Sequence, residues 1–198
     1  MNKYEKPDFW SLKARSEGYP ARSVYKLQEI LQKFPHLIPR HSFCALDLGA
    51  APGSWSLYLL RHYPARLVSC DLLPLAIQMP ADDAGGSSTF IQGDFTDPAV
   101  QAQIRGHGAY SLILSDAAPA TSGSKTLDSL RSLELAKTAL FYAETCLEEG
   151  GGFAVKFFQG SESADFIAGA RRSFSAVKIF KPQACRSNSV ETYIIGTR

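Results

Sequence analysis

The sequence lacks several features that would place it in a specialised class. It has no apolar run of membrane-spanning length, because Pro74 and Pro80 interrupt the nearest candidate. The first seven residues are polar and contain no apolar stretch like that of a secretory signal. The histidines are scattered and no two cysteines have the CxxC spacing, so we predict no metal site and four buried free thiols. These cysteines are Cys44, Cys70, Cys146 and Cys185. The pattern favours a cytoplasmic protein without a membrane partner.

The chain also has little net charge, only +2, but that charge is unevenly distributed. Residues 1–33 contain seven Lys/Arg against four Asp/Glu, and residues 171–198 contain six against one. The middle of the chain is therefore acidic. Basic ends around an acidic centre are typical of a protein that binds a polyanion, although ordinary solvated termini would give the same pattern.

Alternating patterns along the 198 residues predict a single α/β domain, residues 1–198, in which residues 1–18 form a loosely held extension. Apolar residues recur at helical spacing over 21–33. Runs of strand length follow at 43–48, 66–70, 88–91, 110–115, 152–156, 175–180 and 190–196. Helical stretches lie between them at 53–62, 97–105, 125–148 and 161–173. This order predicts a Rossmann-like, doubly wound sheet of seven mostly parallel strands, with the last two as an antiparallel edge hairpin.

Small, acidic and ionisable residues follow five successive strands of this predicted sheet. They are the loop from Gly49 to Gly53, then Asp71, Asp94, Asp116 and Lys156. Open α/β sheets bind ligands at the carboxyl ends of their strands. A single such residue is often part of an ordinary loop, but five together predict a binding site.

The glycine loop, followed by Trp55, has the spacing Gly49-xxx-Gly53. It has neither the GxGxxG dinucleotide pattern nor the Gly-Lys-Ser/Thr of a phosphate loop. Small residues allow the backbone to approach a ligand closely. A loop of this kind without a phosphate grip suits a nucleoside such as S-adenosylmethionine.

Two carboxylates are candidates for binding the nucleoside itself. Asp71 ends the second strand, where a carboxylate can accept hydrogen bonds from both hydroxyls of a ribose. Asp94 could bind the amino group of adenine. Both have an alternative role as a helix cap, and for Asp94 the helix would begin near Asp97.

Lys156 stands in an apolar run that should lie in the middle of the sheet. Burying an ammonium group is costly unless it has a partner, so a structural role is rare for a lysine in such a place. Asp116, at the end of the adjacent strand, is the expected partner.

The motifs around these residues resemble the FtsJ/RrmJ family of RNA 2′-O-methyltransferases, from about Tyr19 to the C-terminus. The similar segments are Asp47-Leu48-Gly49-Ala50-Ala51-Pro52-Gly53, Cys70-Asp71-Leu72-Leu73-Pro74, Gln92-Gly93-Asp94-Phe95, Ser115-Asp116 and Val155-Lys156. The resemblance implies a class I methyltransferase that uses S-adenosylmethionine and releases S-adenosylhomocysteine. It also implies cofactor binding by Gly49, Gly53, Trp55, Asp71, Asp94 and Asp116.

The family has a catalytic Lys-Asp-Lys-Glu tetrad, and the resemblance assigns it to Lys26, Asp116, Lys156 and Glu191. Lys156 would take or orient the proton of the ribose hydroxyl, and Asp116 would hold Lys156. The implied substrate is RNA, a uridine of large-subunit (23S) ribosomal RNA within a large ribosomal subunit, modified by a monomeric enzyme. Arg22, Lys26, Lys178, Lys181 and Arg186 are the candidate RNA contacts, with Arg171 and Arg172 as further basic residues near the C-terminus.

Departures from the family pattern affect the expected substrate contacts rather than the tetrad. The loop 75–87 is longer, Ala120 replaces an asparagine, and Asn188 and Val190 replace arginines. Transfer RNA and messenger-RNA caps are alternative substrates because their 2′-O-methyltransferases share the tetrad. A base or amino methyltransferase is disfavoured, since Asp116-Ala117-Ala118-Pro119 departs from the Asn/Asp-Pro-Pro-aromatic motif. A non-catalytic RNA-binding or ribosome-assembly protein would be expected to have lost tetrad residues.

Overall fold

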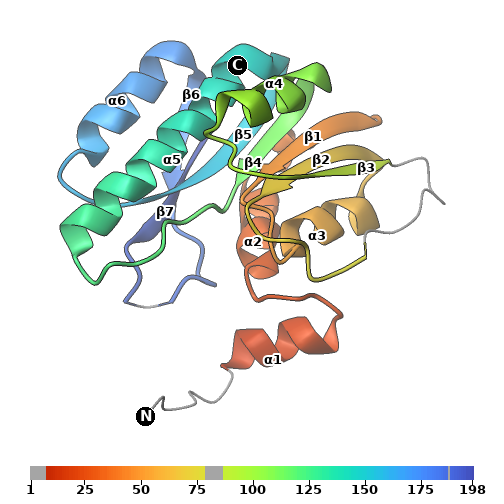
Figure 1. The fold of residues 1–198 in the computed structure, drawn as a ribbon, viewed down its shortest axis with the longest axis horizontal. Coiled ribbons are helices and arrows are strands. Elements are labelled where there is room, and N and C mark those ends of the chain that lie inside the picture. The colour runs from red at the N-terminus through yellow and green to blue at the C-terminus, as the bar shows by residue number, and fades with distance from the viewer. Residues whose placement is uncertain (1–7, 79–86, 187) are drawn as a thin grey trace.

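A seven-stranded sheet forms the centre of the molecule (Figure 1). The computed structural model describes residues 8–78, 87–186 and 188–198. The strands are β1 (Phe43–Leu48), β2 (Ala65–Asp71), β3 (Ser88–Gln92), β4 (Tyr110–Ser115), β5 (Leu147–Phe158), β6 (Ser175–Phe180) and β7 (Glu191–Thr197). They lie side by side in the order β3-β2-β1-β4-β5-β7-β6. This arrangement confirms the predicted doubly wound α/β fold.

Strands β1 to β5 pair in parallel, whereas β7 runs antiparallel to both of its neighbours. The expected antiparallel pair is therefore present. However, β7 lies between β5 and β6, so that β6 is the outermost strand on that side of the sheet. The carboxyl end of β5 consequently meets the amino end of β7, where Phe158 pairs with Glu191. All the strand ends expected to contribute to the site lie at this same end of the sheet, where the parallel strands finish.

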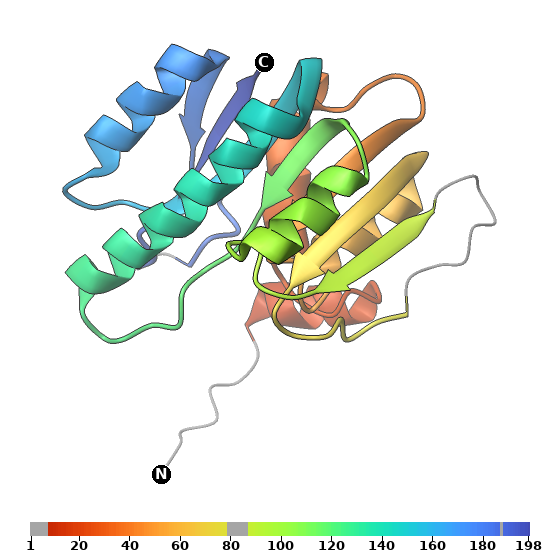
Figure 2. The same ribbon diagram turned by 45° about the horizontal axis from the view of Figure 1, so that its top comes forward.

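Helices cover the sheet on both faces (Figure 2). One face packs against α4 (Pro98–Gly106), α5 (Lys125–Cys146) and α6 (Ser163–Ser173), and the other against α2 (Val24–Lys33), the short 3-10 helix η1 (Pro35–Leu37) and α3 (Ser54–His62). Strand β1 is buried along its whole length, with Leu46 facing the first layer and Ala45 the second. Burial on both faces explains why its sequence is nearly continuously apolar.

The junction between α5 and β5 differs from the prediction of a helix through residue 148. Helix α5 ends at Cys146, and β5 begins at Leu147. The first part of β5 is irregular, because the pairing with β4 shifts register between Tyr110 and Leu112. The glycines at 150–152 therefore lie inside a strand rather than ending a helix.

The N-terminal region also differs from the loosely held extension that the sequence suggested. Phe9–Ser16 form helix α1, which begins at Asp8 as its N-cap. Ala14 is buried, and the Trp10 ring lies 4.9 Å from the ring of Tyr25 on α2. These contacts attach α1 to the body, while residues 1–7 lie outside the described residues. Within the part of the chain that the structure describes, no helix is long and apolar enough to cross a membrane.

Candidate active site

A cavity of about 780 Å³ opens at the carboxyl ends of the parallel strands. This volume lies within the usual range for small-molecule sites. Its lining includes four of the residues predicted to bind the cofactor, namely Gly49, Asp71, Asp94 and Asp116. Helix α5 adds Arg131, Glu134 and Leu135, which no sequence motif indicated. Carboxylates beside apolar walls suit a nucleoside with a ribose, an aromatic base and a cationic centre.

The two glycines of the loop after β1 are required by contacts within the protein. Gly49 has a φ of +73°, and a Cβ there would lie 2.6 Å from Cα of Ala117 in the segment after β4. Gly53 has a φ of +111°, and its Cβ would lie 2.8 Å from Cγ1 of Ile77. Glycine thus lets three chain segments approach one another beside the cavity. Gly53 itself does not line the cavity.

Asp71 connects the glycine loop to the end of β2. Its Oδ2 accepts a hydrogen bond from the N–H of Ala51 at 2.9 Å, and its Oδ1 accepts one from the N–H of Leu73 at 2.8 Å. Each carboxylate oxygen has a second lone pair, so the side chain can still accept hydrogen bonds from a ribose. Asp71 does not cap a helix, which removes that alternative.

Asp71→Ala should weaken S-adenosylmethionine binding by ~1.5–3 kcal/mol, or roughly 10- to 150-fold, the scale for hydrogen bonds to a charged acceptor. Titration calorimetry measures this loss. Asp97→Ala is the matched control, because Asp97 caps α4 by accepting a hydrogen bond from the N–H of Ala99 and does not line the cavity. Unchanged affinity in a folded Asp71→Ala protein would exclude Asp71 from the site.

Asp94 follows β3 and lines the same cavity. Its Oδ1 accepts hydrogen bonds from the N–H of Thr96 at 2.8 Å and from the hydroxyl of Thr96 at 2.7 Å. Because Asp97 caps α4, the helix-cap alternative for Asp94 does not hold. Asp94 instead closes a turn that leaves its carboxylate at the cavity wall.

Trp55, an expected cofactor residue, lies beneath the site instead of in the cavity wall. It is buried, and its Nε1 donates a hydrogen bond to the carbonyl oxygen of Ser23 at 2.8 Å. Ser23 is the residue at the start of α2. The geometry therefore gives Trp55 a role in placing the helix that carries Lys26.

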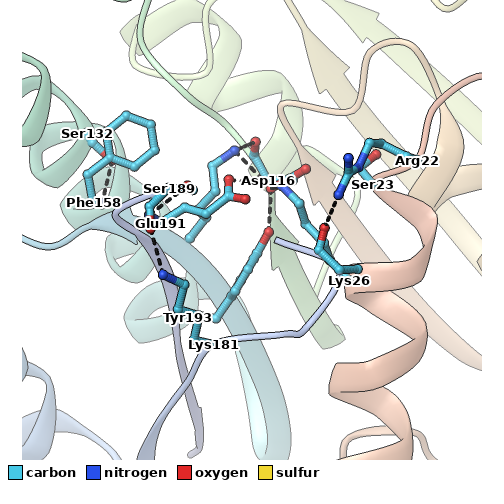
Figure 3. A network of polar contacts seen from close by, with 12 residues as sticks. Arg22, Ser23, Lys26, Asp116, Ser132, Phe158, Lys181, Ser189, Glu191 and Tyr193 are labelled. Atoms are coloured by element: carbon cyan, nitrogen blue, oxygen red, sulfur yellow. Dashed lines mark hydrogen bonds and ion pairs between the residues drawn. The ribbon is translucent and has the colours of Figure 1, made fainter. Parts of the chain in front are cut away.

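The four predicted tetrad residues converge although they come from distant parts of the chain. Figure 3 labels three of them, Lys26, Asp116 and Glu191. Lys156 Nζ lies 2.9 Å from Asp116 Oδ1 and donates a hydrogen bond to the carbonyl oxygen of Asp116 at 2.5 Å. Lys26 Nζ lies 3.0 Å from Glu191 Oε2 and 3.7 Å from Asp116 Oδ1. Two lysine Nζ atoms thus alternate with two carboxyl groups beside the cavity.

Charge compensation explains how this cluster tolerates burial. Burial alone would raise the pKa of Asp116, but Lys156 and Lys26 outweigh it and hold that pKa below its usual value. Burial alone would lower the pKa of Lys26, and Asp116 and Glu191 outweigh it and raise that pKa instead. Asp116 is therefore a carboxylate and Lys26 a cation at neutral pH.

Tyr193 is a member of this site that the sequence analysis missed. Its hydroxyl donates a hydrogen bond to Asp116 Oδ1 at 2.6 Å, and it pairs across the strands with Lys156 (Figure 3). Burial and the neighbouring Asp116 raise its pKa well above the usual value, so it remains a hydrogen-bond donor. The signal was the strand period of two, which puts Tyr193 on the same face of β7 as Glu191.

The basic residues considered as RNA contacts fall into three groups. Arg22 is engaged inside the protein, where it pairs with Asp8 and donates a hydrogen bond to the carbonyl oxygen of Ala184. Lys178, Lys181 and Arg186 are exposed, on β6 or on the chain leading from its end at the site edge. Arg171 and Arg172 lie in the last turn of α6, just before β6 begins, and therefore at the opposite end of the strands from the site.

All four cysteines are buried free thiols, as predicted. Among the described residues no group of three or more His, Cys, Asp or Glu side chains could hold a metal ion. Residues 79–86 of the longer loop lie outside the described part of the chain.

Comparison with known proteins gives matches that span the chain. The model of the family described as FtsJ-like methyltransferase matches residues 19–198. A protein of Treponema denticola named ribosomal RNA large subunit methyltransferase E is 45% identical over 98% of this chain and 96% of its own length. A protein of the same name from Desulfosudis oleivorans is 40% identical over 96% of this chain and 89% of its own.

Solved structures agree with this assignment. A Plasmodium falciparum protein described as a ribosomal RNA methyltransferase superimposes with a TM-score of 0.74 at 26% identity, over 91% of this chain and 98% of its own. Human methyltransferase-like protein 13, solved with S-adenosylhomocysteine, has a TM-score of 0.65 at 12% identity, covers 87% of this chain and 82% of its own, and supports the fold alone. The family match and the identity of these relatives together show that the chain belongs to the FtsJ-like methyltransferases.

Proposed function

We propose that this methyltransferase modifies a ribose 2′-hydroxyl of large-subunit ribosomal RNA. The observation that carries the proposal is the Lys26–Asp116–Lys156–Glu191 cluster next to a nucleoside-sized cavity. Relatives that cover nearly the whole chain are named for the same substrate. A uridine of the 23S RNA is the expected target, on the family resemblance.

The cofactor is S-adenosylmethionine, which supplies an electrophilic methyl group when bound. Asp71 would hold its ribose, Asp94 its adenine, and Asp116 would lie nearest the reacting centre. Most of the acceleration comes from alignment of the hydroxyl with the methyl group, which is worth up to ~7–11 kcal/mol. Proton transfer adds ~10²–10⁴-fold.

Within the tetrad, Lys156 is the group that orients the hydroxyl or, once its Nζ has released a proton to solvent, receives the hydroxyl proton on the free amine. Asp116 holds Lys156 through both its carboxylate and its carbonyl oxygen, while the Tyr193 hydroxyl fixes the carboxylate. Lys26 and Glu191 complete the charge balance of the site. All of these groups come from one chain, so we propose a single domain that acts as a monomer in the cytoplasm, where its substrate would be found.

Mapping of 2′-O-methyl groups in RNA from cells that lack this protein tests the proposal. We expect one ribose of the large-subunit RNA to lose its methyl group, and the wild-type gene to restore it. A Lys156→Ala gene should not restore it. A missing methyl group on transfer RNA, on a cap or on a base would contradict the proposed substrate.

The RNA footprint should lie on the exposed basic residues near the site edge. Replacing Lys181 and Arg186 with glutamine should weaken binding of all RNA sequences alike. The slope of the logarithm of the binding constant against the logarithm of the salt concentration should also become shallower, by roughly one unit for each lost phosphate contact. The same change at Arg171 and Arg172 is the control, because these residues lie at the opposite end of the strands from the site. Equal effects of the two pairs on the slope would contradict this footprint.

A further inference from the structure

One carboxylate outside the tetrad ties helix α2 to the loop between β6 and β7. Glu29 of α2 accepts a hydrogen bond from the N–H of Gln183 at 2.6 Å through Oε2, and one from the N–H of Ala184 at 2.8 Å through Oε1. Both oxygens of the carboxylate therefore bind consecutive backbone groups. Hydrogen bonds to an ionised acceptor are about twice as strong as neutral ones.

A second residue of the same segment strengthens this connection. Arg22, just before α2, donates a hydrogen bond to the carbonyl oxygen of Ala184 at 2.5 Å. Both backbone polar groups of Ala184, a fully buried residue, are thus held from the α2 side. The helical spacing of three and four residues puts Arg22, Lys26 and Glu29 on one side of this segment. Lys26 meets the tetrad, while the other two hold the loop.

The loop leads directly to the tetrad. The Cys185 thiol next to Ala184 is buried against Glu191, and this burial, reinforced by the Glu191 carboxylate, raises the pKa of Cys185 to about 12. Further along, the N–H of Glu191 donates a hydrogen bond to Ser189 Oγ at 3.1 Å. The loop thus adds to the pairing of Glu191 with Phe158 in holding the Glu191 side chain toward Lys26.

We propose that Glu29 is a positioning residue for methyl transfer, which holds the β6–β7 loop on α2 and so sets the Lys26–Glu191 ion pair. This inference rests on the proposed function. If the loop is released, Glu191 can move away from Lys26, and Lys26 then competes with Lys156 for Asp116. The methyl-transfer rate should suffer, whereas cofactor affinity should not, because the cavity is lined by other segments.

Glu29→Gln tests the proposal. A glutamine retains one acceptor oxygen and turns an N–H₂ group toward a backbone N–H, so one of the two bonds is lost. With saturating RNA and S-adenosylmethionine, we expect single-turnover methylation to slow about tenfold, within the ~10²-fold that misplacement by about 1 Å can cost. Cofactor affinity should stay at the wild-type value, and the amides of Gln183 and Ala184 should exchange hydrogen faster.

Two further variants separate positioning from a general loss of stability. Glu29→Asp keeps a carboxylate on a shorter arm and should recover part of the lost rate. Glu144→Gln, at an exposed glutamate of α5, removes the same charge far from the loop and should leave the rate unchanged. A Glu29→Gln protein that also loses cofactor binding would show a role in the whole fold and would overturn the proposal.

A double-mutant cycle gives the decisive comparison. If Glu29 acts through Glu191, Glu29→Gln should cost much less in a Glu191→Gln background than in the wild type. Equal costs in the two backgrounds, or an unchanged rate in the single variant, would overturn the proposal. If the wild-type protein does not methylate RNA, it is the proposed function that fails. Amide exchange at Gln183, Ala184 and Glu191 then tests the positioning role alone, and exchange that is unchanged in Glu29→Gln would refute it.

Discussion

Lys156→Ala is expected to slow single-turnover methyl transfer by at least ~10²-fold, the lower range for a positioned proton acceptor. The side chain is only 6% exposed and its Nζ contacts both the carboxylate and the carbonyl oxygen of Asp116. No water could take over this position with the same alignment. Cofactor affinity should hardly change, because Lys156 is not among the residues that line the cavity.

Lys156→Arg should be almost as damaging as the alanine variant. A guanidinium remains protonated and cannot accept the hydroxyl proton, and its planar fork does not fit a site built around a compact ammonium group. Rapid-quench measurement of methylated RNA, with calorimetry of cofactor binding on the same samples, separates the two steps. Lys33→Arg, at an exposed lysine in the last turn of α2, is the matched control.

An arginine variant with a rate close to the wild type would contradict this role. Position 156 would then supply only charge or orientation. In that case Asp116 becomes the better candidate for the base, because it lies within contact distance of both lysines and of the Tyr193 hydroxyl.

The sheet and two of the tetrad residues, Asp116 and Lys156, could be predicted because they depend on local patterns. Apolar runs that alternate with helices give parallel strands, and parallel strands bring their carboxyl ends to one edge. Asp71, Asp94 and Asp116 follow from that rule alone. Lys26 and Glu191 needed the family resemblance, since a lysine on a helix and a glutamate on a strand have no local signal.

The remaining features depend on contacts between distant segments. The position of β7 between β5 and β6 depends on which strands pair with each other. The alternation of strands and helices along the chain does not determine that pairing. Helix α1 is held by Trp10 against Tyr25, so its order follows from packing rather than from its own weakly amphipathic sequence. Glu29 would be read as a solvated helix residue until the loop that it binds is placed.

A second large effect, on the pH dependence of stability, is expected at Asp47. This residue lies in β1 just before the glycine loop, and its side chain is buried. The residue is 1% exposed. Its Oδ2 accepts a hydrogen bond from Ser56 Oγ at 2.6 Å, and among the described residues its Oδ1 has no hydrogen-bond partner. Burial, aided by the nearby carboxylates of Asp116 and Asp71, raises the pKa of Asp47 to about 7.

This raised pKa makes the stability of the protein depend on pH in a defined direction. In the unfolded chain Asp47 loses its proton near the ordinary pKa of about 4, whereas in the fold it keeps the proton up to about 7. Between these values the folded state binds more protons, so the stabilising contribution is complete below about pH 4 and is lost as the pH rises through 7. A difference of about three pKa units corresponds to ~4 kcal/mol.

Asp47→Asn should abolish this dependence, because an amide has nearly the shape of the neutral acid and does not ionise. We expect the variant to gain stability relative to the wild type by up to ~4 kcal/mol as the pH rises from about 4 to about 8. Denaturant unfolding of both proteins at several pH values measures the difference, in which the other titrating groups largely cancel. Asp165→Asn, at an exposed aspartate of α6, controls for the loss of one negative charge. A difference between wild type and Asp47→Asn that stays constant over this range would mean that Asp47 titrates alike in the folded and unfolded chains.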